Sequence, residues 1–186
     1  MNSIIDKKDI LINAVLFQIL WFVAILGQGI WAFIPLAFMC IHLLSMRKKQ
    51  AQYVLVLLVL ASIGVVFDSI YHYIGVYQFA SDSLMLAYLN LPIWLACLWL
   101  GFCLTLPVSL SWLVKKPYLF IFACSLLGPM SYLAGRRLGG LEFSDANLWL
   151  LALEWWVFSI IALTLLFPKL GVLNSSPVFL EEESSC

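Results

Sequence analysis

Charged residues are scarce in this chain, and none occurs between Ile10 and Met46. They make up 11% of the 186 residues, and hydrophobic residues make up 64%, whereas soluble domains average about 25% and about 45–50%. At ~1.5 Å per helical residue, the uncharged run would extend ~55 Å, nearly twice the ~30 Å hydrocarbon core of a bilayer. The run therefore predicts two membrane-spanning helices, which the turn residues Gly27-Gln28-Gly29 separate.

Signatures of several catalytic and metal-binding classes are also missing. The five cysteines show no C-x-x-C spacing, so we expect neither a disulfide nor a structural metal site. No H-E-x-x-H, G-x-S-x-G or P-loop pattern occurs, and the two histidines lie on separate predicted helices. The formal net charge is zero, which argues against a nucleic-acid partner. We therefore expect no cofactor and no metal ion.

Charge breaks and turn residues divide the chain into six predicted spans, which form a single transmembrane domain over residues 1–171. The predicted fold is all-α, a polytopic membrane protein with a six-helix transmembrane bundle. The spans cover about residues 10–26, 30–46, 53–75, 93–114, 118–134 and 148–167. The connection 76–91 is too long for a turn, and we expect a short interfacial helix there, capped by Ser81 or Ser83. We expect the acidic tail 172–186 to be disordered.

Lysine and arginine are unevenly distributed over the predicted loops. Cytoplasmic loops are enriched in these residues, so the pattern places both termini in the cytoplasm. Eight of the ten basic residues then lie inside, namely Lys7, Lys8, Arg47, Lys48, Lys49, Lys115, Lys116 and Lys169. Arg136 and Arg137, which follow the fifth span, lie outside and break the rule.

Two acidic residues, Asp68 and Glu154, lie within predicted spans. A charged side chain at the bilayer centre costs about 2.5–3.5 kcal/mol, so each of them needs a partner. Both lie ~10 Å below the outer surface, and the stems of Arg136 and Arg137 are long enough to reach them from that surface. We therefore expect an outer cluster in which an arginine pairs with a carboxylate.

Helical spacing extends this cluster into a candidate polar pocket. Tyr71 and His72 share a face with Asp68, which could orient His72 as a proton acceptor. Thr105 and Tyr132 lie on stripes of small residues that let neighbouring helices approach. The candidate pocket residues are Asp68, Tyr71, His72, Thr105, Tyr132, Arg136, Arg137 and Glu154. A structural ion pair that locks three helices together is the alternative interpretation, and both stay open.

Aromatic residues gather near the predicted membrane boundaries. Such a pattern is typical of an interfacial belt that anchors helices in the bilayer. The expected belt contains Trp94, Trp149, Trp155, Trp156, Tyr77 and Tyr88 on the outer side and Trp112 and Tyr118 on the inner side.

Three groups of residues carry a resemblance to a known family. They are Phe17-Gln18-x-x-Trp21 with Asp68; then Pro92-x-Trp94, Leu98-Trp99, Phe102, Thr105-Leu106, Ser109-Leu110 and Trp112-Leu113; and last Gly128-Pro129-x-Ser131-Tyr132-x-Ala134-Gly135 with Leu138-Gly139. Through them, about residues 13–167 resemble small bacterial inner-membrane proteins known only as a domain of unknown function. The resemblance implies a location in the bacterial cytoplasmic membrane, a link to lipid-modifying enzymes as partners, and no established activity.

Three classes of function fit these observations. Arginines suited to phosphate favour a lipid-associated accessory or lipid-binding protein, with membrane lipids as partners and a polar pocket in the outer half of the bundle. An intramembrane enzyme acting on a lipid is the first alternative, although no complete catalytic constellation can be named. A small transporter subunit is the second, although no internal repeat is visible.

Overall fold

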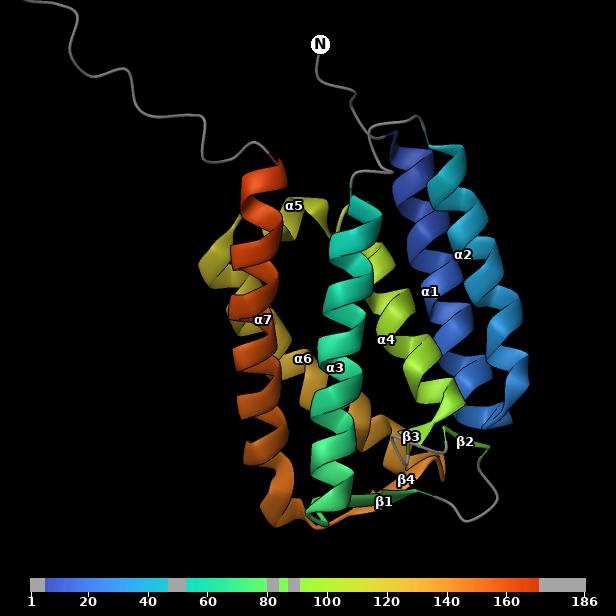
Figure 1. Cartoon of the computed structure of the whole chain (residues 1–186), viewed down its shortest axis with the longest axis vertical. Helices are drawn as coiled ribbons and strands as arrows, with labels where there is room; N and C mark the ends of the chain where they lie inside the picture. Colours follow the sequence, from blue (N-terminus) through green and yellow to red (C-terminus); the bar gives the residue numbers. More distant parts are fainter. Residues whose placement is uncertain (1–5, 47–52, 80–83, 87–90, 171–186) are drawn as a thin grey trace, which may run out of the picture.

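The computed structural model describes residues 6–46, 53–79, 84–86 and 91–170, and most of them are helical. The long helices lie side by side (Figure 1): α1 (Lys7–Gly27), α2 (Phe33–Ser45), α3 (Val54–Tyr73), α4 (Ile93–Thr105), α6 (Pro117–Arg137) and α7 (Leu148–Leu170). The four-residue helix α5 (Ser111–Val114) and the 3-10 turns η1 (Ile30–Ala32) and η3 (Asp145–Asn147) connect them. The predicted all-α class is confirmed for the body of the protein.

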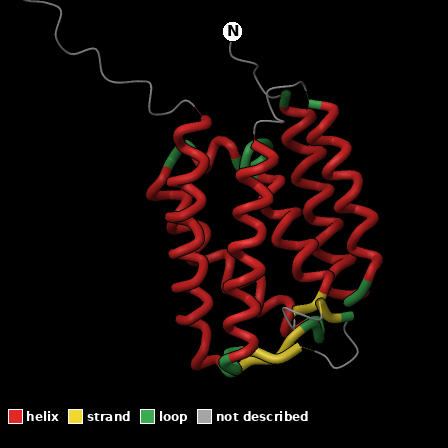
Figure 2. The backbone as a smooth tube through the Cα atoms, in the orientation of Figure 1, coloured by secondary structure: helices red, strands yellow, loops and turns green. Residues whose placement is uncertain are grey.

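Successive long helices alternate in direction, so their connections gather at two ends of the bundle (Figures 1 and 2). α1, α3 and α6 begin at the end that carries α5, and α2, α4 and α7 begin at the opposite end. The opposite end also carries the short strands of the protein. We refer to these as the α5 end and the strand end.

Four helices of the described chain are long and apolar enough to cross a membrane. They are α1, α3, α6 and the segment Asp145–Leu166, which combines η3 with most of α7. The predicted spans 30–46 and 93–114 correspond to shorter apolar helices, Ile30–Ser45 and Ile93–Thr105. The protein is therefore a mostly helical protein with four helices of membrane-spanning length and composition.

The span predicted over 93–114 is interrupted, because α4 ends at Thr105. Pro107 has no backbone N–H to donate to the carbonyl oxygen of Cys103, so the helix ends just ahead of it, although Leu106 keeps helical dihedrals (φ −57°, ψ −46°). Side chains replace part of the lost helical bonding: Asn13 Nδ2 donates to the Leu104 carbonyl oxygen (3.3 Å), and Ser109 Oγ donates to Asn13 Oδ1 (2.7 Å).

The turn predicted at Gly27-Gln28-Gly29 is confirmed. Gln28 ends α1 in the left-handed conformation with φ +43°, an uncommon value for a residue with a side chain. Its side-chain nitrogen donates to the carbonyl oxygen of Gly139 (2.8 Å), which ties this turn to the connection after α6.

Short antiparallel strands at the strand end were not predicted. β1 (Tyr77–Phe79) pairs with β4 (Leu141–Phe143), and β2 (Met85–Leu86) pairs with β3 (Leu91–Pro92). The prediction of an interfacial helix within 76–91 is wrong for the described residues of this connection, which contribute to β1, β2 and β3. Ser81, Ser83 and the tail 172–186 lie outside the described residues. β1 and β4 each follow a glycine with positive φ, and in each the middle residue is exposed between two less exposed neighbours.

The expected aromatic belt is only partly matched by exposure. Trp149, Trp156, Trp112 and Tyr118 are exposed, whereas Trp94, Trp155 and Tyr77 are buried in the core. Tyr88 lies outside the described residues. Glycines make room for two of the core indoles: a Cβ on Gly64 would lie 2.2 Å from the ring of Trp99, and one on Gly128 would lie 2.2 Å from the ring of Trp155. Each of these two glycines therefore leaves the space that a tryptophan ring of a neighbouring helix occupies.

Candidate functional site

Asp68 lies near the strand end of α3 and is fully buried. Tyr77 and Tyr132 both donate from their hydroxyl groups to Oδ1, the latter at 2.6 Å, and Trp99 Nε1 donates to Oδ2 at 2.5 Å. Burial, followed by the neighbouring Asp68 carboxylate, raises the pKa of the Tyr77 phenol well above its ordinary value, so this hydroxyl keeps its proton and donates it. Asp68 is thus held by three neutral donors from β1, α4 and α6.

Glu154 on α7 lies near Asp68, and the two carboxyl groups interact electrostatically. Only 3% of Glu154 is exposed, and neither of its carboxyl oxygens accepts a hydrogen bond from a donor group of the described residues, so the Asp68 carboxyl is the polar group that it faces. Tyr71 joins the two helices beside them, because its hydroxyl donates to the carbonyl oxygen of Leu150 on α7 (3.0 Å). The structure therefore brings together Asp68, Tyr71, Tyr132 and Glu154 of the predicted site.

The predicted pairing of an arginine with one of these carboxyl groups is wrong. Arg136 instead forms an ion pair with Asp145 (2.7 Å), and its Nη1 also donates to the carbonyl oxygen of Phe143 (2.8 Å). Arg137 is exposed at the end of α6. The physical reason is local: β4 and η3, which follow α6, bring the Phe143 carbonyl oxygen and the exposed Asp145 side chain to the arginine, so it need not enter the bundle.

Two further predicted residues do not belong to the cluster. His72 Nδ1 lies 3.1 Å from the carbonyl oxygen of Tyr77 and donates its proton there, so Asp68 does not orient the imidazole through this nitrogen as predicted. Thr105 ends α4 near the α5 end, and its hydroxyl donates to the Phe102 carbonyl oxygen (2.6 Å). Thr105 therefore lies near the α5 end of the bundle, away from Asp68, which is near the strand end.

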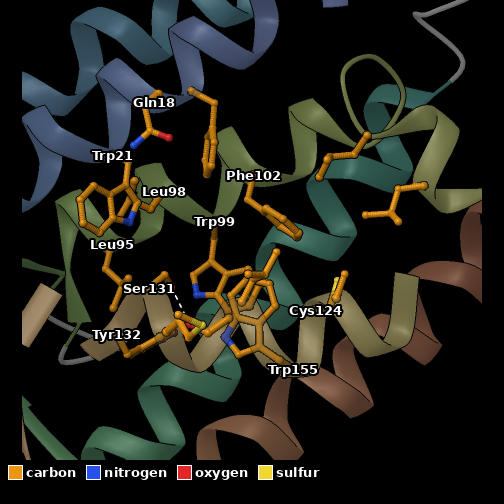
Figure 3. Close-up of a pocket in the computed structure, with 17 residues that line it drawn as sticks. Gln18, Trp21, Leu95, Leu98, Trp99, Phe102, Cys124, Ser131, Tyr132 and Trp155 are labelled. Atoms are coloured by element: carbon orange, nitrogen blue, oxygen red, sulfur yellow. Dashed lines mark hydrogen bonds between the residues drawn. The ribbon is translucent and has the colours of Figure 1, made fainter. Parts of the chain in front are cut away.

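An open, largely apolar pocket of about 480 Å³ lies beside the buried carboxyl groups, between α1 on one side and α6 on the other (Figure 3). α4 and Trp155 of α7 supply further walls. Its lining residues are Phe17, Gln18, Trp21, Leu95, Leu98, Trp99, Phe102, Leu110, Leu113, Ala123, Cys124, Leu127, Gly128, Met130, Ser131, Tyr132 and Trp155. Apolar side chains dominate this list, in contrast to the polar pocket that the sequence predicted.

Two side chains belong both to the polar cluster around Asp68 and to the wall of the pocket. Trp99 and Tyr132 line the pocket, and the polar atom of each donates to Asp68. Trp99 also stacks on Trp155, with ring centroids 5.0 Å apart and an angle of 18° between the planes. Asp68 and Glu154 themselves are buried and do not line the pocket. The polar cluster is therefore closed, and its aromatic donors form part of the pocket wall.

Gln18 is the most polar feature of the pocket rim. It lies near the middle of α1, is exposed, and projects from that helix toward the pocket beside Trp21 (Figure 3). Within the described chain no hydrogen bond of its amide is found. The i, i+3 spacing of Gln18 and Trp21 places both side chains on one face of the helix, and this spacing is the sequence signal for this side of the pocket.

Two donors to Asp68 were not identified from the sequence. Tyr77 was assigned to the membrane boundary, and Trp99 carried only the family resemblance. The signal for Tyr77 is the turn at Gly75, whose φ of +80° reverses the chain after α3 and returns it over the last turns of that helix. For Trp99 the sequence offers a small residue, Gly64, on the face of α3 that also carries Asp68, and the structure shows the indole in that space.

The helices, their lengths and their apolar surfaces define a helical membrane protein. The sequence profile of a family described as a protein of unknown function (DUF2878) matches residues 10–164, and the chain belongs to that family. No curated protein and no solved structure gives a significant match.

Proposed function

We propose that this protein is a multi-spanning inner-membrane protein that binds the apolar chain of a membrane lipid in the pocket between α1, α4 and α6. The pocket carries the proposal: its volume of about 480 Å³ lies within the range of small-molecule sites, and its lining is dominated by apolar side chains. The sequence-based proposal of lipid binding is kept, but the part of the lipid that is bound changes from headgroup to chain.

The depth of the pocket supports a chain as ligand. Phe17 and Gln18 lie about midway along α1 (Lys7–Gly27), so they are ~15 Å from either end of that helix. Ala123 and Cys124 are likewise inside α6 (Pro117–Arg137), away from both termini. In a hydrocarbon core ~30 Å thick, this is the depth of acyl chains, not of headgroups. The arginine expected to bind phosphate is occupied by Asp145.

The same proposal includes a topology of six spans with both termini in the cytoplasm. The alternating directions of α1, α2, α3, α4, α6 and α7 support it (Figure 1). Of the described basic residues, Lys7, Lys8, Lys115 and Lys116 lie at the α5 end, which favours that end as the cytoplasmic one.

Reporter fusions test the topology. A reporter that is active only outside the cytoplasm should be silent at the C-terminus and active when inserted near Ser83. An active C-terminal fusion would mean an odd number of spans and would contradict the proposed orientation.

Photocrosslinking tests lipid binding. The full chain is purified in detergent and incubated with limiting amounts of a phospholipid that carries a photoactivatable diazirine in the middle of one acyl chain. After illumination, we expect saturable formation of about one adduct per protein, displaced by excess unlabelled phospholipid, as a single site requires. Peptide mass spectrometry should locate the adduct on pocket-lining residues of α1 and α6.

Two neighbouring leucines of α6 provide a matched pair of variants. Leu126 and Leu127 are 49% and 59% exposed, and only Leu127 lines the pocket. Both substitutions should be tolerated because both side chains are exposed. Leu127→Trp should reduce the saturable adduct several-fold by narrowing the pocket, and Leu126→Trp should leave it unchanged. Equal effects of the two, or adducts spread without saturation over exposed helix faces, would refute a specific lipid site.

A further inference from the structure

The bundle interior holds two carboxyl groups whose hydrogen-bonding needs are met unequally. Asp68 accepts hydrogen bonds from Tyr77, Tyr132 and Trp99. Neither carboxyl oxygen of Glu154, which is only 3% exposed, accepts a hydrogen bond from a donor group of the described residues, and the group that it faces is the Asp68 carboxyl. A buried carboxylate without a donor is far more costly than a buried neutral acid. The arrangement therefore favours the charge on Asp68 and a proton on Glu154.

Among the described residues, the groups around this pair supply no positive charge. Those that interact with it are Tyr71 from α3, Tyr77 from β1, Trp99 from α4 and Tyr132 from α6. In the described part of the chain, Arg136 forms an ion pair with Asp145, and His42 Nε2 lies 3.4 Å from Asp9 Oδ1; both contacts are away from the two buried carboxyl groups. Two adjacent carboxylates without a cation repel each other, and a single proton removes that repulsion.

We propose that Asp68 and Glu154 form a proton-binding site, a carboxylate and carboxylic acid pair that holds one proton inside the bundle. When the proton enters, an O–H bond forms on Glu154; when it leaves, that bond breaks and the pair gains one negative charge. No other bond changes, and no second reactant is required. This site is distinct from the proposed lipid pocket, because neither carboxyl group lines it.

Infrared spectroscopy of the full chain, in a detergent that has no carbonyl group, tests the proposal. At about pH 7 exposed carboxyl groups are ionised, so the carbonyl band of a protonated carboxylic acid reports a buried acid. We expect this band in the wild-type protein. It should shift when the protein is produced with glutamate labelled with carbon-13 at the side-chain carboxyl. This labelling assigns the band to a glutamate without changing the sequence.

Three variants locate the proton. Glu154→Gln should lose the band, Asp68→Asn should keep it, and Glu142→Gln, at an exposed position of β4, should leave the spectrum unchanged. The isotope experiment remains decisive where Glu154→Gln fails to fold. The proposal is overturned by a wild-type spectrum without the band, by a band that ignores the glutamate label, or by a band that persists in Glu154→Gln. A band that disappears when sodium chloride replaces choline chloride would assign a metal cation to the pair and overturn it equally.

Discussion

Substitution of Gly64 by alanine tests the packing that positions Asp68. A Cβ at residue 64 would lie 2.2 Å from two atoms of the Trp99 ring and 2.6 Å from a third. The indole cannot simply turn away, because its Nε1 donates to Asp68 and its other face stacks on Trp155. The added methyl group therefore overpacks this contact and also pushes the Trp99 indole away from the carboxylate.

Two destabilising contributions and one stabilising contribution set the magnitude of the change in the free energy of unfolding. Overpacking in a close-packed interior costs about 1–3 kcal/mol. Displacement of the indole would add about 1.5–3 kcal/mol for the lost hydrogen bond to a charged group. Alanine returns up to about 1 kcal/mol of helix propensity relative to glycine. We expect Gly64→Ala to lower the free energy of unfolding by about 2–4 kcal/mol.

Unfolding in detergent, followed by tryptophan fluorescence, measures this loss. Gly27→Ala is the matched control, because a Cβ there meets only the Trp31 side chain, at 3.7 Å and beyond, which is ordinary contact. The control should unfold within about 0.5 kcal/mol of the wild-type protein. A Gly64→Ala variant as stable as the wild type would show that Trp99 does not occupy this space and would refute the packing around Asp68.

Further predictions concern single polar side chains. Tyr132→Phe should lower the free energy of unfolding by about 1.5–3 kcal/mol. In an Asp68→Asn background the accepting group is neutral, so the same substitution should cost only about 0.5–1.5 kcal/mol. Equal losses in this double-mutant cycle would mean that Asp68 is not charged. Asp145→Asn should cost less than about 1 kcal/mol in the same assay, because its side chain is 76% exposed. Arg136→Ala should cost more, because it also loses a bond to a backbone carbonyl oxygen; equal costs would contradict that difference. In the photocrosslinking assay the wild-type protein should prefer a lipid whose acyl chain bears a mid-chain hydroxyl group over one with a plain chain, because the Gln18 amide needs a hydrogen-bond partner at this depth. Gln18→Leu should abolish that preference. An unchanged preference would exclude contact between the hydroxyl group and Gln18.

The sequence predicted the helices well because their signal is long and independent of context. Runs of apolar residues define α1, α3 and α6 within a few residues, and the glycines at 27 and 29 mark the turn between the first two helices. The strands escaped detection because each spans only two or three residues, too few for a period of two to be recognised. The break after Thr105 was readable from Pro107, but the apolar run masked it.

The site was predicted in part. Asp68 and Glu154 were identified because acidic residues are rare within spans, and this rule needs no structure. Their partners were not, because the choice between an arginine and an aromatic donor depends on tertiary geometry. Charge complementarity favoured Arg136, yet that residue finds a nearer acid in Asp145. Trp99 is 31 residues from Asp68 along the chain, and its contact depends on a glycine on a neighbouring helix.

Neutral aromatic donors suit a buried carboxylate beside an apolar pocket better than an arginine would. An arginine brings a second charge whose own desolvation must be offset, whereas a phenol or an indole brings one donor on a largely apolar body. Tyr132 and Trp99 can therefore direct a polar edge to Asp68 and present apolar surface to the pocket. Because the same two side chains bond the carboxylate and line the cavity, the shape of the pocket wall depends on Asp68, a residue that the cavity does not touch.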